Sequence, residues 1–225
     1  RRIGPKGSGK WERISWDEAL DAIAGRMLDY KQHFGAESIV MGYGTGRENE
    51  AVIYRFANLL GTPNVLTAGH FCYGPRIATS IITCGTNPIV DYENDPKCIM
   101  VWGNNLVISN PDCYKGEPFS VSLDAGAKLI AVDPRFTRIA ARADVWLQLR
   151  PGTDTALALG MLNVIVNEEL YDKEFVANHV YGWEPFVKRV NEYPVEKVAQ
   201  ITWVPPDKIR HAARLFATTK PAAIQ

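Results

Sequence analysis

The residues in this sequence that could do chemistry are a set of polar loops, a glycine-rich string, and a few isolated thiol and imidazole groups. The polar loops follow three short apolar runs, and each carries residue types suited to a nucleotide. They are Gly103-Asn104-Asn105 after the run that ends at Trp102, Asp133-Pro134-Arg135 after the next run, and Arg150-Pro151-Gly152-Thr153-Asp154 after the third.

The order of these loops matches the parts of a dinucleotide site. In a doubly wound sheet, ligands bind beyond the carboxyl ends of the strands. The first loop would give backbone amides to a diphosphate, and Asp133 would take ribose hydroxyls. A carboxylate in the third loop can accept hydrogen bonds from N1 and N2 of guanine. Alternatively, Thr153 or Asp154 only caps the next helix, which is the commoner role for a lone residue of this type.

The glycine-rich string Gly42-Tyr43-Gly44-Thr45-Gly46 follows a predicted strand and precedes a predicted helix, as a dinucleotide fingerprint does. Arg47 stands where a third glycine would permit close packing of the helix, and no acid ends the next predicted strand, at 64–68. A turn that needs flexible backbone explains the string better than an NAD site, which stays an alternative.

The cysteines form no C-x-x-C pair that would indicate a zinc or iron–sulfur site. They are Cys72, Cys84, Cys98 and Cys113. Such scattered thiols indicate a reducing or anoxic compartment rather than a secreted disulfide framework. By itself, a single cysteine such as Cys72 is more simply a small buried hydrophobe than a metal ligand. Nearby, His70 could move protons or equally make a structural hydrogen bond, and Arg76 could hold an anionic substrate.

The composition excludes several classes of partner. The chain has 25 basic and 25 acidic residues and a formal net charge of zero, with no block of like charge, so we expect no nucleic-acid partner. Its longest apolar stretches fall short of the roughly 20 residues that a bilayer requires, so we expect no direct membrane insertion. The sequence starts at Arg1 without a methionine and stops inside a predicted strand, which suggests a segment of a longer protein.

The elements that must position these loops alternate between helix and strand. Ser15 and Glu18 fit a capping box at the start of the first helix, and Gly35 ends it. The pattern predicts helices at 16–34, 49–60, 154–168, 173–179 and 206–218, and strands at 38–42, 98–102, 129–132, 145–149 and 221–225. This alternation predicts an α/β fold with parallel, helix-covered sheets.

Four segments together resemble the molybdopterin oxidoreductases of the dimethyl sulfoxide reductase superfamily. In order, they are Gly9-Lys10-Trp11-Glu12-Arg13-Ile14-Ser15-Trp16-Asp17-Glu18-Ala19, then Val101-Trp102-Gly103-Asn104-Asn105, then Val132-Asp133-Pro134-Arg135 with Thr137 and Ala143-Asp144, and finally Arg150-Pro151-Gly152-Thr153-Asp154. The first resembles the segment that follows the iron–sulfur domain in this family. The others resemble successive contacts to one molybdopterin guanine dinucleotide, and the resemblance spans nearly the whole chain.

The resemblance also implies a role for Cys72. The string Gly69-His70-Phe71-Cys72-Tyr73-Gly74-Pro75 falls where members carry the residue that ligates the metal. A soft thiolate suits molybdenum or tungsten already held by pterin dithiolenes. Family membership implies a bis(molybdopterin guanine dinucleotide) cofactor and two-electron redox chemistry on a small-molecule substrate. His70 is the second candidate catalytic residue, and the other cysteines match no family position and are expected to be structural.

The family pattern further implies parts that lie outside these residues. They are a [4Fe-4S] cluster upstream, a domain for the second pterin downstream, and an electron-transfer subunit as partner. It implies that residues 1–70 and 218–225 form one α/β unit, into which a doubly wound cofactor-binding unit of residues 71–217 is inserted. Two other functions stay open, namely a non-redox hydratase of the acetylene hydratase type and a cofactor-free scaffold. The sequence leaves open whether the compartment is the cytoplasm or the periplasm of an anaerobic prokaryote.

Overall fold

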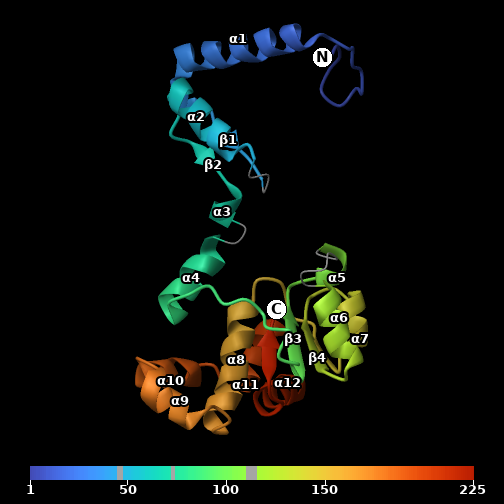
Figure 1. The fold of residues 1–225 in the computed structure, drawn as a ribbon, viewed down its shortest axis with the longest axis vertical. Helices are drawn as coiled ribbons and strands as arrows, with labels where there is room; N and C mark the ends of the chain where they lie inside the picture. The colour runs from blue at the N-terminus through green and yellow to red at the C-terminus, as the bar shows by residue number, and fades with distance from the viewer. Residues whose placement is uncertain (45–47, 72–73, 110–115) are drawn as a thin grey trace. The chain divides into compact units, whose positions relative to one another are not determined.

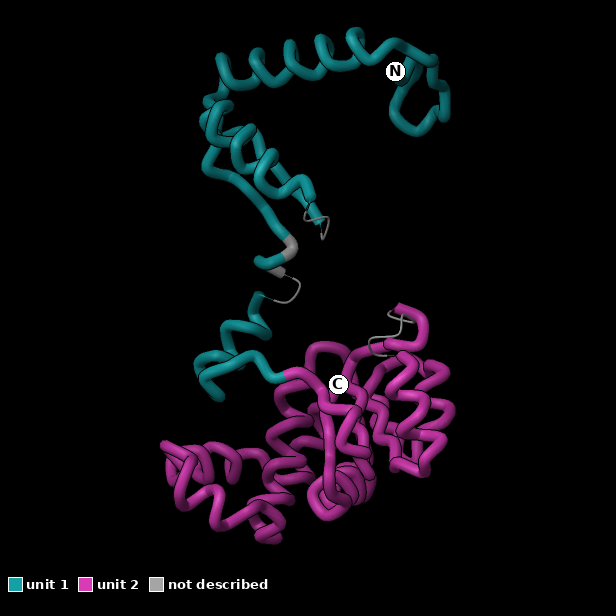
Figure 2. Tube along the Cα trace, viewed as in Figure 1, with its two compact units in different colours: residues 1–88 teal, residues 89–225 magenta. Residues whose placement is uncertain are grey.

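The computed structural model describes residues 1–44, 48–71, 74–109 and 116–225 of the chain. These residues divide into two compact units, Arg1–Pro88 and Ile89–Gln225, which Figure 2 colours separately. Within the described residues, no helix has the length and apolar character needed to cross a bilayer.

The first unit is built from helices and one short parallel strand pair (Figure 1). Its elements are α1 Trp16–Phe34, η1 Ala36–Ser38, β1 Met41–Gly42, α2 Glu50–Leu60, β2 Val65–Leu66, α3 Ala68–Phe71 and α4 Gly74–Cys84. The predicted capping box starts α1, because the Glu18 amide donates to the Ser15 hydroxyl oxygen while the Glu18 carboxylate accepts from the Ser15 amide. Gly35, at φ 83°, ends this helix as predicted.

The second unit contains a parallel sheet covered by helices. Its elements are β3 Cys98–Trp102, α5 Leu106–Ser109, α6 Gly116–Asp124, β4 Lys128–Val132, α7 Arg138–Arg142, β5 Val145–Leu147, α8 Asp154–Asn167, α9 Lys173–His179, α10 Trp183–Asn191, α11 Val195–Thr202, α12 Pro206–Thr218 and β6 Ala222–Ile224. The strand order is β5-β4-β3-β6, and each recorded pairing is parallel. This arrangement confirms the predicted α/β class with parallel sheets.

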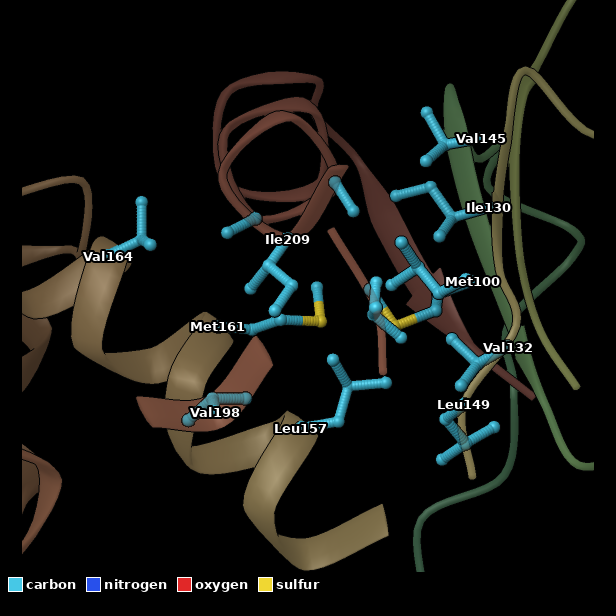
Figure 3. Packing of buried hydrophobic residues seen from close by; sticks show 14 of the residues in the cluster. Met100, Ile130, Val132, Val145, Leu149, Leu157, Met161, Val164, Val198 and Ile209 are labelled. Carbon is cyan, nitrogen blue, oxygen red and sulfur yellow. The ribbon is translucent and has the colours of Figure 1, made fainter. Parts of the chain in front are cut away.

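The sheet of the second unit is buried on both faces. Cys98 and Met100 of β3 face a core formed with α8, α11 and α12, while Ile99 and Val101 face a core formed with α5, α6 and α7. Successive strand residues point to opposite faces, so an apolar run without polar gaps is what two covered faces require. Figure 3 shows Met100 and Val132 pointing toward the helical residues Leu157 and Met161.

The core of the described residues lies almost entirely in the second unit. In the first unit, Ala57 and Thr62 are the buried positions among described residues. Large apolar side chains there are exposed, such as Trp16 at 83% and Ile82 at 84%.

The structure differs from the predicted elements in several places. The predicted strand at 38–42 is shorter, because residues 36–38 form a 3-10 turn before β1. Seven of the described helices lie outside the predicted helix ranges, namely α3, α4, α5, α6, α7, α10 and α11. Helix α11 follows Pro194 and has no side-chain hydrogen bond at its N-cap, so it lacks the start signal that marks α1.

The division that the resemblance implies, residues 1–70 with 218–225 and residues 71–217, stays a prediction. The two compact units of this chain meet between Pro88 and Ile89. Strand β6 pairs with β3 in the second unit, because the register joins Cys98 to Ala222 and Met100 to Ile224. The insertion of one unit into another stays a prediction for the longer protein.

Candidate cofactor site

The loop after β3 lies where the strand order of the sheet reverses. From β3 the sheet grows through β4 to β5, and the chain then returns to place β6 on the other side of β3. At this reversal the amide of Trp102 donates to the carbonyl oxygen of Gln225 at 2.9 Å. Ligands of doubly wound sheets bind beyond the strand ends at such a switch point. The loop Gly103-Asn104-Asn105 therefore has the position that a nucleotide site requires.

The backbone of this loop is open to a ligand. Gly103, at φ 61°, has no atom within 4 Å of where a Cβ would stand. Its own amide continues the ladder by donating to the Val132 carbonyl at 2.8 Å, so it is not available to a diphosphate. The amides of Asn104 and Asn105 donate to no residue that the structure describes. These two amides fit the predicted contact to an anionic group.

The side chain of Asn105 adds an unsatisfied acceptor to the same loop. Its Oδ1 is buried and accepts no hydrogen bond within the described part of the chain. A buried polar atom left unpaired costs roughly 1–3 kcal/mol. Such an atom beside two free amides is consistent with a loop that a ligand completes.

The loop after β4 is fixed in place and leaves half of a carboxylate free. Asp133 Oδ1 accepts from the Arg135 amide at 2.7 Å, while its Oδ2 accepts from no described residue. Its carbonyl oxygen accepts from Trp146 Nε1 at 2.9 Å, and the carbonyl of Pro134 accepts from Gln148 Nε2 at 3.1 Å. An acid with one free oxygen at this edge fits the predicted contact to ribose hydroxyls.

Thr137 and Asp144, which follow this loop in the sequence, form hydrogen bonds within the fold. Thr137 is buried and caps α7, because its hydroxyl oxygen accepts from the Ala140 amide at 3.1 Å. Asp144 directly precedes β5, at the opposite edge of the sheet, and accepts from Lys128 Nζ and the Leu129 amide at 2.8 Å each. Asp144 therefore joins β5 to β4 and lies away from the candidate site.

The loop after β5 is a tight turn. The Thr153 amide donates to the Arg150 carbonyl at 3.2 Å, and Gly152 has a φ of 81°. Proline at the second position and a left-handed glycine at the third are the signature of a type II turn. The Thr153 hydroxyl donates to the same Arg150 carbonyl at 2.6 Å and makes no capping bond to α8. Helix capping therefore does not explain Thr153.

Asp154, in the first turn of α8, links the third loop to the first. Its Oδ1 accepts from Trp102 Nε1 at 2.9 Å, and its Oδ2 accepts from no described residue. The loops that follow β3, β4 and β5 thus lie at one edge of the sheet, as the sequence predicted. Oδ2 of Asp154 therefore remains available to accept hydrogen bonds from a ligand.

The other candidate residues lie in the first unit or outside the described residues. His70 is exposed in α3, and its Nδ1 lies 3.1 Å from both the Thr67 amide nitrogen and the Thr67 hydroxyl oxygen. Arg76 donates through Nη2 to the Pro88 carbonyl at 3.2 Å. Cys72 and residues 45–47 of the glycine-rich string lie outside the described residues. Among the residues that are described, no three His, Cys, Asp or Glu side chains gather as a metal site.

The described cysteines outside this region differ in burial. Cys98 is fully buried in β3, and burial, with a smaller effect of Asp144, raises the pKa of its thiol to about 11. A thiol with a raised pKa is a poor nucleophile and metal ligand. Cys84 is exposed at the end of α4, and Cys113 lies outside the described residues.

The comparisons with known proteins match this arrangement to one family. The model of the molybdopterin oxidoreductase family matches residues 1–224. The chain belongs to the molybdopterin oxidoreductase family. The predicted family resemblance is therefore confirmed.

Several named proteins resemble the chain over nearly its whole length. Acetylene hydratase of Syntrophotalea acetylenica is 43% identical over 100% of this chain, and formate dehydrogenase H of Escherichia coli strain K12 is 37% identical over 96% of it. The solved structure of acetylene hydratase from Pelobacter acetylenicus superposes with a TM-score of 0.73 at 42% identity over 99% of this chain. The chain spans 31% of the length of each of these relatives.

The residues present fit the cofactor class that the molybdopterin oxidoreductase family implies. The amides of Asn104 and Asn105 suit a diphosphate, and the unpaired oxygen of Asp133 suits a ribose. The carboxylate of Asp154 suits a base. Sequence reasoning gave no separate role to Arg150 and none to Trp203, whose ring centroid lies 5.2 Å from the Arg150 guanidinium carbon. No sequence signal marks their pairing, since it arises from tertiary contact between the β5–α8 loop and the end of α11.

Proposed function

We propose that this chain is the part of a molybdenum or tungsten enzyme that binds one molybdopterin guanine dinucleotide. The observation that carries the proposal is the hydrogen bond from Trp102 to Asp154, because it holds the loops after β3 and β5 together at one edge. Membership of the molybdopterin oxidoreductase family supports the pterin, and the polar groups at the edge support the guanine dinucleotide form.

Each loop has one proposed contact. Asn104 and Asn105 bind the diphosphate through their amides, and Gly103 lets the ligand approach the backbone. Asp133 binds ribose hydroxyls through its free oxygen, in a loop shaped by Pro134 and Arg135. Asp154 binds the N1 and N2 donors of guanine, at the end of the turn that holds Gly152 and Thr153.

Cys72 is proposed as the protein ligand of the metal. The cofactor, when bound, supplies a metal that can change oxidation state by two electrons. A thiolate is a soft ligand that suits a metal with sulfur donors and tunes its potential. His70 is two residues from Cys72 in the sequence, and we propose it as the second catalytic residue.

Two-electron redox chemistry on a small-molecule substrate is the reaction class we favour. Relatives named as redox enzymes include formate dehydrogenase H of Escherichia coli and a thiosulfate reductase subunit of Salmonella typhimurium, the latter 31% identical over 100% of this chain. In the longer protein we propose a second guanine dinucleotide, a [4Fe-4S] cluster and an electron-transfer subunit.

A hydratase is the second candidate, because acetylene hydratase shares 43% identity over the whole chain. In that case the same metal site would activate water with no net electron transfer. Turnover by the full-length protein with no redox dye or other electron acceptor would favour the hydratase. Turnover that requires an acceptor would favour the redox enzyme.

The first experiment is metal and nucleotide analysis of the full-length protein purified without oxygen. We expect close to one molybdenum or tungsten, about four iron atoms and about two released GMP per chain. Absence of both metal and GMP would contradict the proposal and favour a cofactor-free scaffold derived from the family.

A further inference from the structure

Arg150 carries a cation at the first position of the turn that leads to Asp154, and no described carboxylate neutralises it. Its amide donates to the Thr202 carbonyl at 2.8 Å, which fixes the start of the turn against the end of α11. Its guanidinium carbon lies 5.2 Å from the ring centroid of Trp203. Among the described residues, no carboxylate forms an ion pair with Arg150. Because an aromatic face leaves the guanidinium donors unused, they remain available to a ligand.

Trp203 occupies a backbone position where glycine is the usual residue. It follows the last residue of α11 in the left-handed conformation, at φ 64°. A bulky residue there is strained, whereas glycine ends a helix in this way without strain. Thr202 and Val204 on either side are buried at 0% and 1%, yet the Trp203 side chain is 69% exposed. The indole is therefore held outward at a cost in backbone strain, an outlier that indicates a use other than core packing.

We propose that Arg150, held by the ring of Trp203, binds the O6 and N7 acceptors of the guanine whose N1 and N2 donors Asp154 binds. This inference rests on the proposed function and names what sets the choice of base. Arginine pairs in bidentate fashion with O6 and N7 of guanine, and this is the commonest specific contact to that base. Adenine presents an amine donor in place of O6 and would meet the guanidinium donor to donor.

The turn from Arg150 to Thr153 separates the residue proposed to bind the acceptors of guanine from the residue proposed to bind its donors. Arg150 is the first residue of the type II turn, and Asp154 directly follows its last residue. A cation at one end and a carboxylate at the other match the acceptor edge and the donor edge of a single purine. Trp102 holds the carboxylate and Trp203 holds the guanidinium, so each charged group has its own aromatic neighbour. Trp203 is in this sense a positioning residue for Arg150.

Three nucleotides that differ by single groups test the two contacts separately. The full-length protein is prepared without cofactor, and dissociation constants are measured for GMP, for 7-deaza-GMP, which lacks N7, and for IMP, which lacks the N2 amine. Because the longer protein is proposed to hold a second guanine dinucleotide, the constants are taken for the site whose GMP binding is lost in Asp154→Ala. For the unaltered protein we expect GMP to bind about tenfold more tightly than 7-deaza-GMP, the effect of one lost hydrogen bond of a bidentate pair. Arg150→Ala should bring this ratio to about one while the GMP to IMP ratio, which reports Asp154, stays unchanged.

Two variants of Trp203 test its positioning role. Trp203→Gly removes the ring and relieves the strained backbone, so the fold is preserved. It should lower the GMP to 7-deaza-GMP ratio several-fold, because the guanidinium loses its support. Trp203→Phe keeps an aromatic face and should retain most of that ratio. A structural role alone would not link the ratio to the aromatic ring.

The outcomes separate this inference from the proposed function. If the unaltered protein prefers GMP to IMP but binds GMP and 7-deaza-GMP equally, the role of Arg150 is wrong and the guanine site stands. A ratio that survives Arg150→Ala would also overturn the inference. If the unaltered protein binds none of the three nucleotides, the proposed guanine site fails and the inference fails with it.

Discussion

The indole Nε1 of Trp102 donates a hydrogen bond of 2.9 Å to Oδ1 of Asp154, a residue 52 positions further along the chain. The bond joins the end of β3 to the first turn of α8 across the carboxyl edge of the sheet. It fixes the orientation of the carboxylate without a ligand, so a base that binds there needs to order fewer side chains.

Trp102→Phe should weaken guanine-nucleotide binding while the fold is kept. Phenylalanine preserves an aromatic ring but removes the donor to Asp154, and the loss of one such bond corresponds to about 1 kcal/mol, or roughly a fivefold weaker affinity for GMP. The measurement is GMP binding to cofactor-free full-length protein. Trp183→Phe in α10 is the matched control, because the Trp183 ring packs at a tilt against Tyr171 instead. Equal affinities in both variants would show that the Trp102 bond does not position the carboxylate.

Cys72→Ala should abolish turnover of the full-length enzyme and alter its metal spectrum. A methyl group cannot ligate the metal, and the smaller side chain should leave the circular dichroism spectrum unchanged. Cys84→Ala serves as the control, because Cys84 is an exposed thiol at the end of α4. Retained turnover together with an unchanged metal spectrum in Cys72→Ala would show that Cys72 does not ligate the metal.

Gly160→Ala should destabilise the second unit by about 1–3 kcal/mol, the usual effect of overpacking a tight contact. A Cβ at Gly160 of α8 would stand 2.7 Å from Cγ1 and 2.9 Å from Cγ2 of Val198 in α11. Denaturant unfolding of the full-length protein measures the change. Adding Val198→Ala to Gly160→Ala should recover part of the loss, because it removes both clashing methyl groups. Strict additivity of the two single effects would contradict this contact.

Asp144→Ala should destabilise the protein in a pH-dependent manner. Partial burial acts to raise the pKa of Asp144, but hydrogen bonds from Lys128 and the Leu129 amide outweigh it and hold the pKa below its usual value. A carboxyl whose pKa is lowered on folding stabilises the protein above its unfolded pKa of about 3.9, and this stabilisation is lost as the pH falls through the lower folded pKa.

The difference in unfolding free energy between the Asp144→Ala variant and the unaltered protein should therefore be about 1–2 kcal/mol at pH 7 and shrink below about pH 4. Denaturant titrations across that range measure it. Glu93→Ala is a suitable control, since the recorded hydrogen bond of Glu93 uses its backbone amide and not its carboxylate. A difference that stays constant down to pH 3 would mean that the Asp144 charge contributes nothing.

The sequence by itself determined the elements whose signals are local. Ser15 and Glu18 are three residues apart, so a capping box could be recognised without knowing the fold. Helices α9 and α12 begin and end where predicted, because Asp172 caps the first and Pro206 opens the second. The alternation of apolar strands with helices indicated a parallel sheet, and parallel strands end at a common edge, so the three loops could be assigned to one site.

Tertiary structure alone decided which side chains meet at that edge. The contacts of Trp102 with Asp154 and of Arg150 with Trp203 each join residues about 50 positions apart, and Asp144 finds Lys128 through the register of β4 and β5. Sequence spacing carries no information on such pairs, because strand order and helix packing select them. Gly103 is a further example. Its position in the loop predicted that its amide would bind a ligand, but in the structure this amide donates to the Val132 carbonyl.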